Sequence, residues 1–97
     1  MIKAGLLVKL TAKAGKEQDV ADFLESAVLL LDGEPLTVNW FAYRISESTF
    51  GIFDTFEGDE GRQAHLAGKV AEALMANAPH LLALEPSIEP VEILASK

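Results

Sequence analysis

The chain has 97 residues, 49% hydrophobic and 24% charged, which is typical of one small globular domain. Its 15 acidic and 8 basic residues give a formal net charge of −7, so we expect no binding to nucleic acid or to an anionic membrane surface, which both require dense Lys and Arg. The absence of cysteine excludes disulfides, thiolate metal sites and a catalytic thiol.

The N-terminal segment, residues 2–12, has a two-residue hydrophobic period, which predicts a β-strand. Its alternating apolar positions are Ile2, Ala4, Leu6, Val8 and Leu10. Because charged residues interrupt this start and no small-residue cleavage site follows, we expect a strand here rather than an export signal, and a cytoplasmic protein.

From Lys16 the hydrophobic period lengthens to three and four residues, which predicts an amphipathic helix. Its apolar face comprises Val20, Phe23, Leu24, Ala27, Val28 and Leu31. Acidic residues crowd its first half, where they complement the helix dipole, and Asp32-Gly33 is expected to end it.

Two segments rich in aromatic and β-branched residues, 36–45 and 49–56, flank the polar turn Ser46-Glu47-Ser48 and predict an antiparallel hairpin. A turn centred on residue 47 predicts the cross-strand pairs Val38–Phe56, Trp40–Asp54, Ala42–Ile52 and Arg44–Phe50, all on one face. The opposite face would carry Asn39, Phe41, Tyr43, Phe53 and Thr55, with Gly51 beside Tyr43.

A second helical region is predicted from Asp59. Its expected apolar face consists of Ala64, Ala67, Ala71, Leu74, Met75 and Ala78. Because proline is disfavoured inside a helix, Pro79 predicts a break near Asn77. A last strand is expected over residues 87–95, at a sheet edge because it contains Pro90.

The order β-α-β-β-α-β in one domain, residues 1–97, predicts an α+β ferredoxin-like sandwich, in which two helices cover one face of a four-stranded antiparallel sheet. Both faces of the hairpin are apolar, and two helices can cover only one of them. A second copy of the sheet is the simplest cover, so we predict a homodimer formed through the sheet faces.

Several segments match a known family in order and spacing. They are Lys13-Ala14-Gly15-Lys16-Glu17 before the first helix, the aromatic strand 40–44, the strand 50–56, and the segment 59–66. The most specific match is an aromatic residue at the end of the third strand followed nine residues later by histidine, here Phe56 and His65. In these features the chain resembles the antibiotic biosynthesis monooxygenase-like (ABM) domains of the dimeric α/β barrel superfamily.

Two positions depart from that pattern: Phe56 stands where Trp is frequent, and Gly68-Lys69-Val70 replaces a Ser-Pro-His motif. The Asn, Trp and His of haem-degrading relatives have no counterpart either, because Asn39 and Trp40 are adjacent and lie on opposite faces. The resemblance implies two sheets that form a shared barrel, with a pocket between sheet and helices in each protomer. It also implies a monooxygenase that oxidises quinols or phenolic compounds without metal or flavin, so we expect no cofactor.

His65 is the first candidate for proton transfer, because imidazole titrates near neutral pH. On a continuous helix His65 would point away from the apolar face and be exposed, and only a bend at Gly68 would let it face the sheet. The second candidate is Asp54, which lies mid-strand between apolar neighbours. It would need a partner such as Arg44 or the Trp40 indole if it is covered; alternatively it is edge-exposed or pairs across a dimer interface.

The aromatic side chains of the hairpin could line a pocket for a planar ligand, or could simply form the core. The candidate substrate-binding residues are Trp40, Tyr43, Phe53 and Phe56, with Asn39 or Arg62 to steady a developing oxyanion. The two histidines do not have a recognisable metal-binding spacing, so we expect no metal site.

Three functions remain open. The first is a cofactor-independent monooxygenase acting on a small planar phenolic or quinol compound. The alternative is a non-catalytic dimeric protein that binds a small aromatic ligand, as a stress or pathway accessory protein. The third is an isomerase or decarboxylase for small cyclic acids, which the superfamily also includes.

Overall fold

A computed structural model describes all residues, 1–97, and confirms the ferredoxin-like architecture. Its strands are β1 (Ala4–Thr11), β2 (Thr37–Arg44), β3 (Thr49–Phe56) and β4 (Ser87–Glu92). They form one antiparallel sheet in the order β2-β3-β1-β4. β4 lies at an edge, as Pro90 predicted, but it ends at Glu92 rather than at residue 95.

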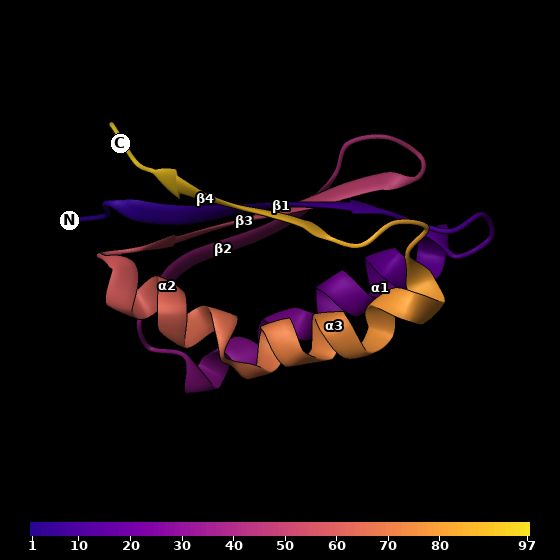
Figure 1. Cartoon of the computed structure of the whole chain (residues 1–97), viewed down its shortest axis with the longest axis horizontal. Coiled ribbons are helices and arrows are strands. Elements are labelled where there is room, and N and C mark those ends of the chain that lie inside the picture. Colours follow the sequence, from indigo (N-terminus) through magenta and orange to yellow (C-terminus); the bar gives the residue numbers. More distant parts are fainter.

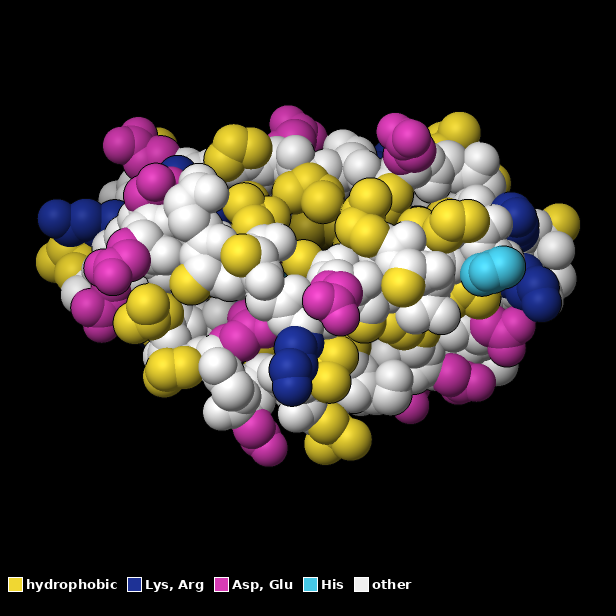
Figure 2. All heavy atoms as spheres, turned by 60° about the horizontal axis from the view of Figure 1, so that its bottom comes forward, with side chains coloured by type: hydrophobic (Ala, Val, Ile, Leu, Met, Phe, Trp, Pro, Cys, Tyr) yellow, Lys and Arg dark blue, Asp and Glu magenta, His cyan; other side chains and the backbone are white.

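The helices form a single layer beneath the sheet (Figure 1). They are α1 (Glu17–Ala27), the 3-10 helix η1 (Val28–Gly33), α2 (Asp59–Leu66) and α3 (Lys69–Leu81). On the helix-bearing side, hydrophobic side chains gather in the upper middle of the view, with acidic ones around them (Figure 2). None of the helices combines the length and apolar character needed to cross a bilayer.

The hairpin register is confirmed at three of the four predicted pairs, Trp40 opposite Asp54, Ala42 opposite Ile52 and Arg44 opposite Phe50; Gly51 lies opposite Tyr43 as predicted. The fourth prediction was wrong. A β-bulge between Thr37 and Asn39 places Thr37 opposite Phe56 and leaves the expected partner, Val38, outside the regular ladder and exposed. Because a bulge adds one residue to its strand, it turns Thr37 toward the helices.

The predicted break near Asn77 was also wrong. α3 continues through Pro79, which lies in its last turn, and the helix closes with a hydrogen bond of 2.9 Å from the Leu82 N–H to the Ala78 carbonyl oxygen. The interruption lies at Gly68, between α2 and α3. Pro79 removes one hydrogen bond from this turn without ending the helix, and the glycine at position 68 marks the place where the helical region is interrupted.

The break at Gly68 changes which side chains of this region are buried. Leu74 and Ala78 are buried as predicted, but Ala64, Ala67 and Met75 are exposed. The first helix also differs slightly from the prediction, because its last residues before Gly33 adopt the tighter 3-10 form.

The main core lies between the sheet and the helix layer, and β1, β3, α1 and α3 all contribute buried side chains to it. Its largest cluster consists of Val8, Leu10, Ala12, Val20, Leu24, Phe50, Ile52, Leu74, Ala78 and Leu82. The outer sheet face has no such cover. There Leu7 lies opposite Phe53, which lies opposite Phe41, and Leu7 and Phe41 are 41% and 56% exposed.

Candidate functional site

His65 lies in the last turn of α2 and is 5% exposed, between the helix layer and the sheet. The sequence allowed either a continuous helix with His65 exposed or a bend at Gly68 with His65 facing the sheet, and the structure has the bend. Nε2 of the imidazole lies 2.8 Å from Oδ2 of Asp54, and Nδ1 is hydrogen-bonded to Oε1 of Glu34. Both ring nitrogens therefore contact a carboxylate.

Each partner of His65 comes from a different element. Asp54 lies in the middle of β3 and is 1% exposed; its partner is His65 rather than Arg44 or the Trp40 indole. Glu34 follows η1 directly, and its side chain is 11% exposed.

The residues around this cluster fix the ring further. The bulge in β2 places the Thr37 hydroxyl 3.3 Å from Oε1 of Glu34 and 3.5 Å from Nδ1 of His65. The Phe56 ring packs beside the imidazole, with 5.6 Å between ring centroids. Strand, bulge and helix end thus hold His65 in one orientation.

Glu34 reaches His65 through space that glycine leaves open. A Cβ atom at position 68 would lie 2.8 Å from Oε2 of Glu34, a separation that real Cβ atoms essentially never show. Gly68 therefore has two effects: it separates α2 from α3, and it admits the Glu34 carboxylate beside the ring.

The surroundings of His65 act on its pKa in opposite directions. Burial is the largest single influence and lowers the pKa of His65, because it disfavours the charged ring. The hydrogen bonds to Asp54 and Glu34, together with the charge of both carboxylates, raise the pKa and outweigh burial. The net result is a pKa of His65 above its ordinary value, so that the imidazolium form persists to higher pH than in an exposed histidine.

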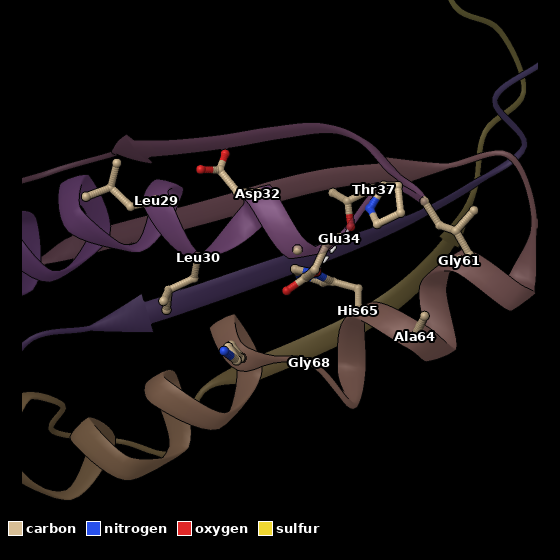
Figure 3. A pocket seen from close by; sticks show the side chains of 13 residues that line it. Leu29, Leu30, Asp32, Glu34, Thr37, Gly61, Ala64, His65 and Gly68 are labelled. Carbon is tan, nitrogen blue, oxygen red and sulfur yellow. Dashed lines mark hydrogen bonds and ion pairs between the residues drawn. The ribbon is translucent and has the colours of Figure 1, made fainter.

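His65 and Glu34 line a cavity of about 440 Å³ between η1, the start of β2 and the two helices that meet at Gly68 (Figure 3). Its apolar wall is formed by Leu29, Leu30, Pro35, Leu36 and Ala64. Polar side chains come from Asp32, Glu34, Thr37, His65 and Lys69. In Figure 3 the side chains of Glu34 and His65 lie against each other, with their hydrogen bond drawn as a dashed line. A volume of this size falls in the range of small-molecule sites.

No group of three or more His, Asp or Glu side chains is arranged to hold a metal ion. Glu34 and Asp54 bind different nitrogens of the His65 ring, so their carboxylates do not converge on a common point.

The other predicted binding residues are dispersed. Trp40 and Tyr43 line a second cavity, between α1 and β2. Asn39 accepts a hydrogen bond of 2.8 Å from the Thr55 hydroxyl, away from His65.

Phe53 belongs to the outer face of the sheet, and Phe56 is fully buried beneath His65. Arg62 makes an ion pair of 2.8 Å with Asp59 and donates to the carbonyl oxygens of Gly5 and Val91, so it does not line the His65 cavity.

Sequence reasoning missed Glu34. It lies in the loop Gly33-Glu34-Pro35, which resembles an ordinary polar connection, and 31 positions separate it from His65. No periodicity or spacing in the sequence signals this contact.

The chain is similar in sequence and structure to the NE2512 protein of unknown function from Nitrosomonas europaea, with 54% identity, coverage of 100% of this chain and 94% of that one, and a TM-score of 0.97. Two structures named "putative antibiotic biosynthesis monooxygenase" also match. The one from Caulobacter crescentus has 14% identity over 97% of this chain and 92% of its own, with a TM-score of 0.82. The one from Nitrosomonas europaea has 11% identity over 95% and 90%, with a TM-score of 0.83. At these identities the likeness shows a shared fold. No protein-family model and no curated protein matches the chain.

Proposed function

This chain belongs to the same protein family as the NE2512 protein of Nitrosomonas europaea and has the ABM-like fold. On that premise we propose that it is a monooxygenase that acts on a small planar phenolic or quinol compound without metal or flavin. The observation that carries the proposal is the buried His65, which is fixed by Asp54 on Nε2 and, together with the Glu34 carboxylate bonded to Nδ1, lines a ligand-sized cavity. A base oriented by a third group at hydrogen-bond distance is the arrangement that general base catalysis requires.

Asp54 sets the tautomer of the base. In the neutral ring, Nε2–H donates to Oδ2 of Asp54, which leaves the lone pair of Nδ1 as the proton acceptor. A substrate hydroxyl bound in the cavity takes the place of Oε1 of Glu34 at Nδ1 and gives its proton there. Asp54 remains bonded to Nε2 and stabilises the resulting imidazolium.

Oxygenation follows from the deprotonated substrate, which is the electron donor. Its ring carbon transfers electrons to O₂ and forms a C–O bond. The O–O bond then breaks, one oxygen remains on that carbon as a carbonyl, and the other leaves as water with the one hydrogen that the carbon carried and the proton held by His65. His65 supplies its proton to the departing oxygen and returns to the neutral form.

The cavity supplies binding groups suited to such a substrate. Leu29, Leu30 and Leu36 offer apolar surface for a flat ring. Lys69 is the cation that lines this cavity, and in this proposal its ammonium group steadies the phenolate, the role that the sequence suggests for Arg62 or Asn39.

The test is oxygen uptake with a panel of hydroquinones and anthrone. We expect uptake above the rate of spontaneous oxidation, and His65→Gln to lower it by about 10²-fold or more because the base is lost. His80→Gln is the matched control, since His80 is exposed in α3 and lies outside the cavity. Binding of these compounds with no oxygen consumption would instead indicate the non-catalytic binding protein, and product formation without oxygen would indicate an isomerase or decarboxylase.

The proposal includes pairing of two copies through their outer sheet faces. The row formed by Leu7, Phe53 and Phe41, with the adjacent Tyr43 at 37% exposed, is an apolar patch that the helices on the opposite face cannot cover. An isologous dimer would bury this patch against itself.

A further inference from the structure

The second cavity of the protein lies between α1 and β2, separate from the one at His65. Its volume is about 540 Å³, and most of the side chains around it are apolar. They include Ala21, Leu24, Val28, Trp40, Ala42 and Phe50. The volume suits a small organic molecule, and the aromatic walls suit a flat one.

Trp40 gives this cavity a specific polar requirement. Its indole nitrogen, Nε1, is buried and has no hydrogen-bond partner. Indole N–H is a donor and cannot accept, and a buried donor without an acceptor is unfavourable. The residue as a whole is only partly buried, and it lines this cavity.

We propose that the cavity between α1 and β2 binds a planar aromatic molecule that bears a carbonyl oxygen, with the carbonyl accepting a hydrogen bond from Nε1 of Trp40. A carbonyl fits better than a hydroxyl because it brings acceptors and no new donor that would need a partner. The ring lies against the aliphatic side chains of α1 and against Phe50. This site goes beyond the proposed oxygenation at His65, because binding of a molecule here does not depend on that reaction.

One group within the protein competes for the same donor. Asp54 lies directly opposite Trp40 in the ladder, and its Oδ1 is also buried without a partner. The experiment must therefore distinguish a ligand carbonyl from this carboxylate oxygen.

Trp40 is the one tryptophan of the chain, so its indole N–H gives a unique resonance in a ¹⁵N–¹H spectrum. We would titrate the protein under nitrogen with chromone, which is flat and has a ring carbonyl, and with naphthalene, which has a similar shape and no acceptor. Chromone should move the indole proton downfield and bind about tenfold more tightly than naphthalene, as one satisfied buried donor implies. Excluding oxygen separates this result from any oxygenation at His65.

Two exposed alanines provide matched variants, one in each cavity. Ala42→Leu fills part of the α1–β2 cavity and should weaken chromone binding at least about tenfold, whereas Ala64→Leu, in the His65 cavity, should leave it unchanged. The proposal is overturned if Ala64→Leu weakens binding as much as Ala42→Leu, or if chromone and naphthalene bind equally.

Two further outcomes would also overturn it. An indole proton that is already at a hydrogen-bonded position and does not respond to chromone would assign the acceptor to Asp54. A chromone affinity that falls as protein concentration rises would mean that a second copy of the chain occupies the cavity.

Discussion

Replacing Glu34 by Gln tests whether the carboxylates beside His65 stabilise its charged form. The substitution keeps the size of the side chain and removes its charge. A hydrogen bond to a charged group contributes about 1.5–3 kcal/mol, and screening by solvent is small here because the Glu34 and His65 side chains are 11% and 6% exposed. We expect Glu34→Gln to lower the free energy of unfolding by about 2 kcal/mol at pH 6, and to lower the pKa of His65.

The sign of the pH dependence follows from the raised pKa of His65. The stabilisation by its carboxylates is fully present below the ordinary histidine pKa of about 6.5 and is lost as pH rises through the higher pKa of the folded state. The difference in stability between the wild-type protein and Glu34→Gln should therefore be largest near pH 6 and should shrink toward pH 9.

Urea unfolding followed by circular dichroism at both pH values, at one protein concentration, measures this difference, and NMR titration of the ring proton on Cε1 measures the pKa of His65. Glu72→Gln, an exposed carboxylate in α3, is the control and should change neither quantity. An equal loss of stability at pH 6 and pH 9, or an unchanged pKa of His65, would refute the reasoning.

Three more predictions concern Gly68, Phe41 and the pH profile of catalysis. Gly68→Ala should push Glu34 away from the ring, which lowers the pKa of His65 and lowers the free energy of unfolding by about 1–3 kcal/mol, as overpacking does. Adding the shorter Glu34→Asp to the same chain should recover part of that stability. If the losses of the two substitutions simply add, the contact between position 68 and Glu34 is not the cause. Phe41→Glu should convert the proposed dimer into a 10.4 kDa monomer in sedimentation. The fold should stay intact, because Phe41 is 56% exposed in the single chain. A wild-type protein that sediments as a monomer would exclude the dimer. The rate of oxygen uptake should rise with pH through the pKa of His65, since the neutral ring is the base. Glu34→Gln should move this rise to lower pH. If the inflection of the pH profile is the same in Glu34→Gln as in the wild-type protein, another group is titrating.

The sheet could be predicted from sequence because its signals are local. Two-residue alternation and a short polar turn determined which residues share a face, and three of the four predicted pairs are confirmed. The fourth failed because the bulge after Thr37 adds one residue to β2, and nothing in the residue types of that segment marks it. The same bulge brings the Thr37 hydroxyl to the cluster, so the irregularity belongs to the site.

The helical region was harder to predict because two residues that weaken helices compete within it. Pro79 lacks a backbone N–H and so removes one hydrogen bond from the last turn of α3, which nevertheless continues to Leu81. Gly68 has less intrinsic effect on a helix, but it lies where the chain must turn, and the space beside it is occupied by a side chain from another loop.

Whether His65 is exposed or buried depends on which of these two residues, Gly68 or Pro79, interrupts the helical region. A helix broken at Asn77 leaves residues 59–76 continuous and turns His65 outward. A helix broken at Gly68 ends α2 one residue after His65 and frees its ring to face β3. Propensity alone favours the first, because proline disrupts a helix interior more than glycine does. The second occurs because it gives the buried Asp54 a partner, and a carboxylate that is 1% exposed requires one. Asp54, an acidic residue in the middle of a strand, was therefore the most informative residue of the sequence about the site, because its need for a partner indicates which way His65 points.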